Sequence, residues 1–142
     1  MSHKLTILYQ NVRGLRTKTT EFYNNLLLSN HDIILVTETW LNDGILDSEL
    51  SDNRYEIFRR DRGSNGGGVM VMCSRGLSAR ARIEWQRDQV ECVWVTIDGR
   101  TIGLKQDLHI ALVYMAPGPT LPARLHEGAL FKQNQLLWSA PE

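Results

Sequence analysis

Runs of apolar and β-branched residues, each bounded by turn-forming residues, predict a series of short strands along the chain. The predicted strands are Leu5–Gln10, Ile33–Thr37, Tyr55–Arg60, Val69–Ser74, Val90–Ile97 and Leu108–Met115. Ile33–Thr37 is a continuous run of β-branched and apolar residues, which is typical of a strand covered on both faces. Val90–Ile97 instead alternates, so we expect Val93, Val95 and Ile97 to share one face.

A helical pattern fills the interval between the first two strands. From Thr17 to Ser29, Phe22 and Leu26 recur on one face, and Thr17 is placed to cap the first turn. A second amphipathic stretch, Leu125–Trp138, predicts a helix near the end of the sequence. Two strands around a helix, followed by antiparallel strands, indicate an α/β (α+β) fold: a mixed sheet with at least one covering helix and an open edge.

Two of the segments that connect predicted strands also have sequences that predict a local structure. Trp40–Asn53 predicts a loop with one helical turn. The run Asp61-Arg-Gly-Ser-Asn-Gly-Gly-Gly68 predicts a hairpin-like connection with positive-φ glycines, or backbone that must approach another group closely.

Composition is that of an ordinary globular domain. The chain has 142 residues, 42% of them hydrophobic and 23% charged, and its formal net charge is zero. No stretch approaches the length of a membrane span, and Met1-Ser-His-Lys leads directly into a strand, so we expect no membrane segment and no signal peptide. Cys73 and Cys92 lie in apolar runs, which favours buried free thiols in a reducing, intracellular compartment.

The charges are unevenly distributed along the chain. Asp32–Asp52 contains six acidic residues and no Lys or Arg, whereas Arg54–Asp88 contains eight Arg and four acidic residues. An acidic end beside a basic face suits a metal site next to a phosphate-binding surface. Ordinary solvated surface charge is an equally weighted alternative.

Polar side chains follow the first two predicted strands. Asn11 follows Leu5–Gln10, and Glu38 follows Ile33–Thr37. Because ligands in open α/β sheets bind beyond the carboxyl ends of strands, we expect the two side chains to lie together. Mg²⁺ takes oxygen ligands from one or two carboxylates and leaves room for substrate phosphate, so the pair predicts a divalent-metal site. Alternatively, Glu38 caps a turn or pairs with an Arg, and Asn11 is a turn former.

Other polar and aromatic residues are weaker candidates. Tyr114, near the end of a late strand, is suited to donate a hydrogen bond to a phosphate, although a core tyrosine is the simpler interpretation. Arg13 and Arg16 flank the first turn and either contact a nucleic-acid backbone or are solvated. Trp40 is interpreted as a packing residue. The four histidines are scattered, and none is placed as an evident general base.

Four motifs, taken in order, resemble the endonuclease/exonuclease/phosphatase superfamily. They are Ile-Leu-Tyr-Gln-Asn11-Val-Arg-Gly-Leu, Asp32-Ile-Ile-Leu-Val-Thr-Glu38-Thr-Trp-Leu, Arg60-Asp-Arg with Gly-Gly-Gly68-Val-Met-Val, and Ala-Leu-Val-Tyr114-Met-Ala-Pro. Within the superfamily, the sequence is most similar to the endonuclease domain of non-LTR retrotransposons of the jockey and LINE type. The resemblance runs from about Leu5 to Pro117.

The resemblance implies a four-layer α/β sandwich of the DNase I-like and exonuclease III-like type, which cuts phosphodiester bonds with Mg²⁺ or Mn²⁺. It places Glu38 on the metal-ligand glutamate, Asn11 on the asparagine beside it, and Tyr114 on the tyrosine that helps to hold the phosphate. It also implies DNA as the partner. In the resembled family the domain nicks target DNA in the nucleus, so that a reverse transcriptase region of the same polyprotein can extend the free 3′ end.

The sequence also departs from the family pattern. It lacks the Gly-Asp-Phe-Asn motif that orients the attacking water, the later metal-associated aspartate and the terminal Ser-Asp-His. We therefore expect residues 1–142 to be the N-terminal part of such a domain, with only the first half of the sandwich, and to be inactive or nearly so.

Two alternative functions stay open. One is a non-catalytic transposon remnant, or a nucleic-acid-binding module that uses the Arg54–Arg87 segment. The other is a superfamily member that acts on a phospholipid or an inositol phosphate.

Overall fold

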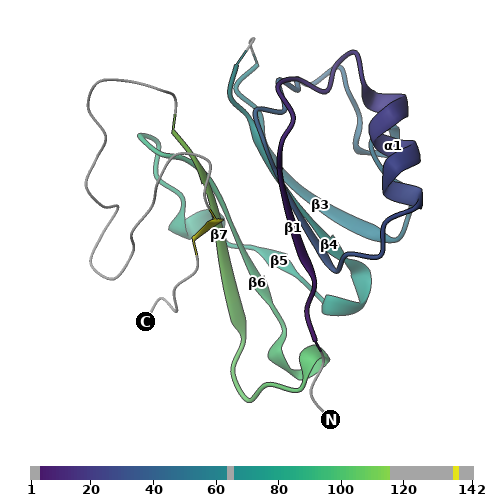
Figure 1. Cartoon of the computed structure of the whole chain (residues 1–142). Coiled ribbons are helices and arrows are strands. Elements are labelled where there is room, and N and C mark those ends of the chain that lie inside the picture. Colours follow the sequence, from purple (N-terminus) through teal and green to yellow (C-terminus); the bar gives the residue numbers. More distant parts are fainter. Residues whose placement is uncertain (1–3, 64–65, 116–135, 138–142) are drawn as a thin grey trace.

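The structure, a computed structural model, describes residues 4–63, 66–115 and 136–137. Two four-stranded sheets pack face to face, and one helix covers the outer side of the first sheet (Figure 1). In spatial order the first sheet consists of β1 (Ile7–Asn11), β2 (Ile33–Thr37), β4 (Val69–Ser74) and β3 (Tyr55–Arg60). The second consists of β5 (Arg80–Ala81), β6 (Glu91–Ile97), β7 (Leu108–Tyr114) and β8 (Leu136–Leu137).

The first sheet is built on a β1-α1-β2 unit, in which helix α1 spans Thr19–Leu27. β1 and β2 are parallel, with Asn11 opposite Thr37, and β4 runs antiparallel to both β2 and β3. All strand pairs of the second sheet are antiparallel. Short 3-10 turns occupy four connections: η1 (Asp47–Glu49), η2 (Arg75–Leu77), η3 (Ile83–Trp85) and η4 (Gly99–Ile102).

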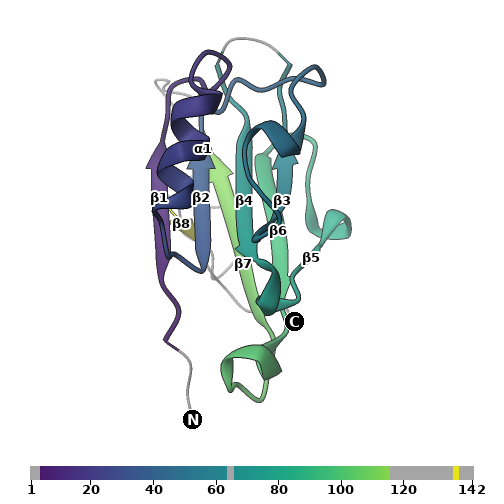
Figure 2. The same cartoon turned by 90° about the vertical axis from the view of Figure 1, so that its right-hand side faces the viewer.

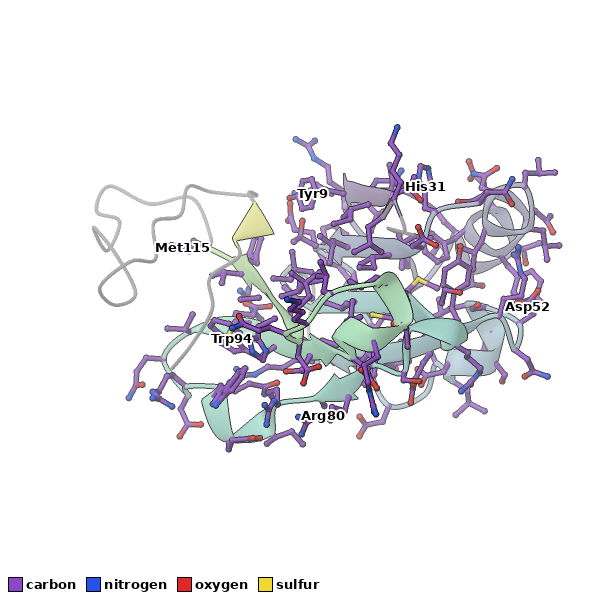
Figure 3. All side chains as sticks on the ribbon, turned by 90° about the horizontal axis from the view of Figure 1, so that it is seen from below. Tyr9, His31, Asp52, Arg80, Trp94 and Met115 are labelled. Atoms are coloured by element: carbon purple, nitrogen blue, oxygen red, sulfur yellow. The ribbon has the colours of Figure 1, made fainter. Side chains whose placement is uncertain are left out.

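Alternating side chains divide the apolar residues between two layers. One face of β2 and β4 packs against the second sheet, where Val93, Val95 and Ile97 share the inner face as their alternation predicts. The opposite face packs under α1, where Leu26 is buried and Phe22 lies against it. The view along the strands shows both sheets, with Tyr9 on the first and Trp94 on the second (Figure 3). Burial of both faces explains why β2 consists of apolar residues and one β-branched Thr37.

Three expectations are corrected by the structure, and a fourth stays untested. The strands form two packed sheets rather than one mixed sheet. α1 begins at Thr19 after Lys18, with no side-chain cap from Thr17. Leu136–Leu137 is a strand paired with β7, so these two residues are not helical, contrary to the helix predicted over Leu125–Trp138. The rest of that range lies outside the described residues. The described layers are helix, sheet and sheet, and the fourth layer of the sandwich stays a prediction.

Ion pairs reduce the free positive charge of the arginine-rich segment. Within the described residues, four of the eight arginines between Arg54 and Arg87 pair with carboxylates: Arg54 with Asp52, Arg59 with Asp47 and Asp61, Arg62 with Glu91, and Arg82 with Glu84. Arg60 donates to the carbonyl oxygen of Val90 at 2.8 Å. The internal pairing leaves less free positive charge than the sequence count indicates.

Both cysteines are buried free thiols, as expected. Burial, assisted by the charge of Glu56, raises the pKa of Cys73 to about 12. No helix in the described part of the chain combines the length and the apolar character that crossing a bilayer requires.

An aromatic cluster covers part of the outer face of the second sheet. The Trp85 ring lies edge-on to Trp94 and to His109, with ring centroids 5.5 Å and 5.0 Å apart, and the Arg82 guanidinium lies 4.2 Å from the Trp85 centroid. His109 Nδ1 is 2.8 Å from the hydroxyl of Thr96. Burial lowers the pKa of His109, and the charge of Arg82 lowers it further, whereas Asp107 raises it.

We predict that His109 makes the fold sensitive to acid. Because its pKa is lower in the folded chain than the unfolded value of about 6.5, its contribution is complete above that pH and is lost as the pH falls through the folded pKa. Denaturant unfolding at pH 7.5 and pH 5 is expected to show a smaller acid-induced loss of stability in His109→Gln than in the wild type. Equal losses would contradict the assignment.

Candidate metal centre

Three of the sequence-predicted residues meet at one end of the two sheets. Asn11 is the last residue of β1, Glu38 directly follows β2, and Tyr114 is the last residue of β7. The arrowheads of these three strands lie at the same end of the molecule (Figure 2). The parallel pairing of β1 with β2 therefore brings Asn11 beside Glu38, as expected for two residues at the carboxyl ends of neighbouring strands.

The Asn11 side chain contacts the Glu38 carboxylate directly. Asn11 Nδ2 donates a hydrogen bond to Glu38 Oε2 at 2.9 Å. The other end of the amide, Asn11 Oδ1, is buried and has no hydrogen-bond partner among the described residues. A buried acceptor without a partner is costly, and a bound ion is one of the explanations for it.

Tyr114 approaches the same carboxylate from the second sheet. Its side chain is 5% exposed. Burial raises the pKa of Tyr114, and the charge of Glu38 and a hydrogen bond to the Glu38 side chain raise it further. The Tyr9 hydroxyl lies 2.9 Å from Thr37 Oγ1, and burial also raises the pKa of Tyr9. Both phenols therefore keep their protons at neutral pH, and Tyr114 acts as a donor toward Glu38.

Glu38 has hydrogen-bond donors but no cationic partner within the described ranges. No Lys or Arg of residues 4–63 and 66–115 forms an ion pair with it. No group of three or more His, Cys, Asp or Glu residues suited to a metal occurs in the described part of the chain either. A half-buried carboxylate beside an unpartnered amide oxygen is a sparse, all-oxygen donor set. It fits Mg²⁺ or Mn²⁺, because such ions keep several water or phosphate ligands.

The backbone that carries Glu38 is strained. Arg13, Glu38 and Trp40 adopt φ values of 50°, 55° and 56°, and they are three of the four non-glycine residues with positive φ in the described part of the chain. Such conformations cost about 1–3 kcal/mol each and cluster at functional sites. Gly14 N–H donates to the Glu38 carbonyl at 2.7 Å, and Leu15 N–H donates to the Thr39 carbonyl at 2.8 Å. These bonds fix the turn against the loop that follows β1.

Gly67 and Gly68, which we call the glycine segment, hold the other side of the turn. Trp40 N–H donates to the Gly67 carbonyl at 3.1 Å, and Thr39 N–H donates to the Gly68 carbonyl at 3.3 Å. Gly68 has a φ of 90°, and a Cβ atom there would overlap Thr39 Oγ1. The close backbone approach and the positive φ values expected from the glycine run are both present.

The remaining candidates lie beside this site. Arg13, Arg16 and Trp40 line a shallow hollow together with Gly14 and Thr17. The Trp40 ring packs so closely on Gly14 that a Cβ there would overlap it, which is the packing role interpreted from the sequence.

Glu91 was missed as a functional candidate. It is the first residue of β6 and lies opposite Tyr114 in the β6–β7 pairing. An acidic residue at the start of a strand has no distinctive signal in the sequence. Only the pairing register, which the sequence does not give, places it near the site.

Comparison with known proteins supports the fold. No protein-family model matches the sequence, and the search of curated proteins gives no match. Among solved structures, the crystal structure of the AP endonuclease LMAP from Leishmania major is similar, with a TM-score of 0.59 and 16% sequence identity. The match covers 79% of this chain and 40% of that one. The chain thus spans well under half of that enzyme, and its fold is similar to that of the matched part of the enzyme.

We predict that the glycine segment tolerates no side chain at its second position. Gly68→Ala adds both a positive-φ penalty and an overlap with Thr39, whereas Gly63→Ala adds only the penalty, because Gly63 has a φ of 83° and no atoms within 4 Å of its Cβ position. Gly63→Ala is expected to cost about 1–2 kcal/mol and Gly68→Ala about 1–3 kcal/mol more. Denaturant unfolding measures both, and equal costs would contradict the packing described.

Proposed function

We propose that residues 1–142 are the N-terminal part of a divalent-metal-dependent endonuclease domain that cuts the phosphodiester backbone of DNA. One observation carries the proposal: the carboxylate of Glu38 and the amide of Asn11 are hydrogen-bonded at a shared strand end, with a buried amide oxygen left over. The nuclease-type fold of the chain supports it. The motifs around these residues favour an endonuclease of the retrotransposon type, whose polyprotein also carries a reverse transcriptase and acts in the nucleus.

Each of the three residues has a distinct role in this proposal. Glu38 and Asn11 Oδ1 would hold Mg²⁺ or Mn²⁺, and the bound ion would supply positive charge to the phosphoryl oxygens. Asn11 Nδ2 fixes the orientation of the carboxylate through its hydrogen bond. In the free chain the Tyr114 hydroxyl donates to Glu38, and with DNA bound it would donate instead to a phosphate oxygen.

The chain on its own is proposed to bind metal but to cleave DNA extremely slowly. The Gly-Asp-Phe-Asn and Ser-Asp-His motifs, which orient the attacking water and complete the site in the resembled family, do not occur in the 142 residues. Loss of members of a catalytic unit typically removes several orders of magnitude in rate.

A nucleic-acid-binding module is the less favoured alternative. It would rely on the arginines between Arg54 and Arg87, and the structure pairs four of these eight with carboxylates. The ion pairs lower the positive potential available to a phosphate backbone.

The proposal predicts that metal binding depends on Glu38. In Mn²⁺ titrations followed by the electron paramagnetic resonance of the free ion, Glu38→Gln is expected to weaken binding at least about tenfold, because the carboxylate charge is lost. Asn11→Ala is expected to weaken it less. Glu84→Gln is the control, because it removes a carboxylate that pairs with Arg82 outside the site. Unchanged affinity in Glu38→Gln would contradict the proposal.

The same variants test the activity of the chain alone. Supercoiled plasmid incubated with wild-type chain and Mg²⁺ is expected to remain unnicked above background. Nicking that disappears in Glu38→Gln would show that these residues suffice for cleavage, contrary to the proposal.

A further inference from the structure

Glu91 is a second carboxylate near the site, and the proposed function gives it no role. It faces Tyr114 across the β6–β7 pair, and its neighbours Cys92 and Val93 point to the outer and inner faces of the second sheet respectively. By alternation, Glu91 points inward toward the first sheet. Its side chain is only 18% exposed.

Both carboxylate oxygens of Glu91 are engaged by the first sheet. Oε1 accepts a short hydrogen bond from the Gly68 N–H, and Oε2 accepts one from Arg62 Nη2 at 2.6 Å. The Arg62 guanidinium folds back over the glycine segment, where a Cβ at Gly67 would overlap it. Glu91 is therefore anchored in the second sheet and holds the glycine segment of the first.

The glycine segment transmits this anchoring to the turn that carries Glu38. Its two carbonyls accept the N–H groups of Thr39 and Trp40, the two residues that follow Glu38. The loop after β1 holds the turn from the opposite side through Gly14. The left-handed conformation of Glu38 is thus held between two backbone segments, one of which is fixed by Glu91.

We propose that Glu91 is a positioning residue that sets the location of the Glu38 carboxylate through Gly68 and the Thr39–Trp40 backbone. This inference rests on the proposed function, because Glu38 matters here as a metal ligand. Glu91 itself does not bind the metal, since Gly68 and Arg62 occupy its oxygens. The ion pair with Arg62 balances its charge beside Glu38.

Two conservative variants distinguish the effect of the position of the Glu91 carboxylate from the effect of its charge. Glu91→Asp keeps the charge but withdraws the carboxylate by one methylene, so it cannot contact Gly68 and Arg62 at once. Glu91→Gln keeps the length and the oxygen that accepts from Gly68 but loses the charge. Glu84→Asp is the matched control, because Glu84 also pairs with an arginine, at 3.1 Å, on the outer side of the second sheet.

The test uses the full chain and two measurements, Mn²⁺ affinity and the amide NMR resonances of Thr39 and Trp40 without metal. Glu91→Asp is expected to weaken Mn²⁺ binding about tenfold and to shift both resonances. The Mn²⁺ affinity of Glu91→Gln is expected to stay within about twofold of the wild-type value, because this variant keeps the contact with Gly68 that positions the Glu38 carboxylate. Glu84→Asp is expected to change neither measurement.

The outcomes distinguish the inference from the proposed function. If Glu38→Gln loses Mn²⁺ binding while Glu91→Asp retains it, the positioning role is wrong and the proposed metal site stands. If Glu91→Gln loses binding as fully as Glu38→Gln, with the amide resonances unmoved, Glu91 is a metal ligand and the positioning role is again overturned. If Glu38→Gln retains Mn²⁺ binding, the proposed function itself fails.

Discussion

A left-handed turn places the Glu38 carboxylate against the Asn11 amide, and the geometry of the candidate site follows from this turn. The parallel pairing of β1 and β2 ends with Asn11 opposite Thr37, so the next residue must leave the sheet at that point. A right-handed or extended continuation would carry the carboxylate elsewhere. The positive φ of Glu38 costs free energy, and backbone hydrogen bonds from two separate loops offset that cost.

The second sheet gives this turn its rigidity. The core between the sheets is formed by fully buried residues of β2, β4, β6 and β7, so the two sheets are fixed relative to each other. Tyr114 and Glu91 project from that fixed sheet toward Glu38 and Gly68 respectively. A sparse metal site with one carboxylate gains from such support, because few ligands are available to correct a misplaced one.

The sequence predicts local structure well wherever an apolar run lies between turn-forming residues. Ile33–Thr37, Tyr55–Arg60 and Val69–Ser74 are strands with the boundaries expected, and Asn11 and Glu38 lie together as the parallel β1–β2 pair requires. Periodicity tells which residues share a face but not which sheet a strand joins, so the division into two sheets did not follow from periodicity and was implied only by the family resemblance. The contacts of Glu91 were missed for the same reason, because they depend on the register between strands and on the packing of one sheet on the other.

Paramagnetic line broadening in the NMR spectrum of the full chain locates bound Mn²⁺ and so tests the candidate metal centre directly. Substoichiometric Mn²⁺ is expected to broaden the side-chain amide of Asn11 and the backbone amides of Glu38 and Thr39 first, and Glu38→Gln is expected to abolish this broadening. Broadening centred elsewhere, or unchanged by Glu38→Gln, would contradict a metal centre at the shared end of β1 and β2.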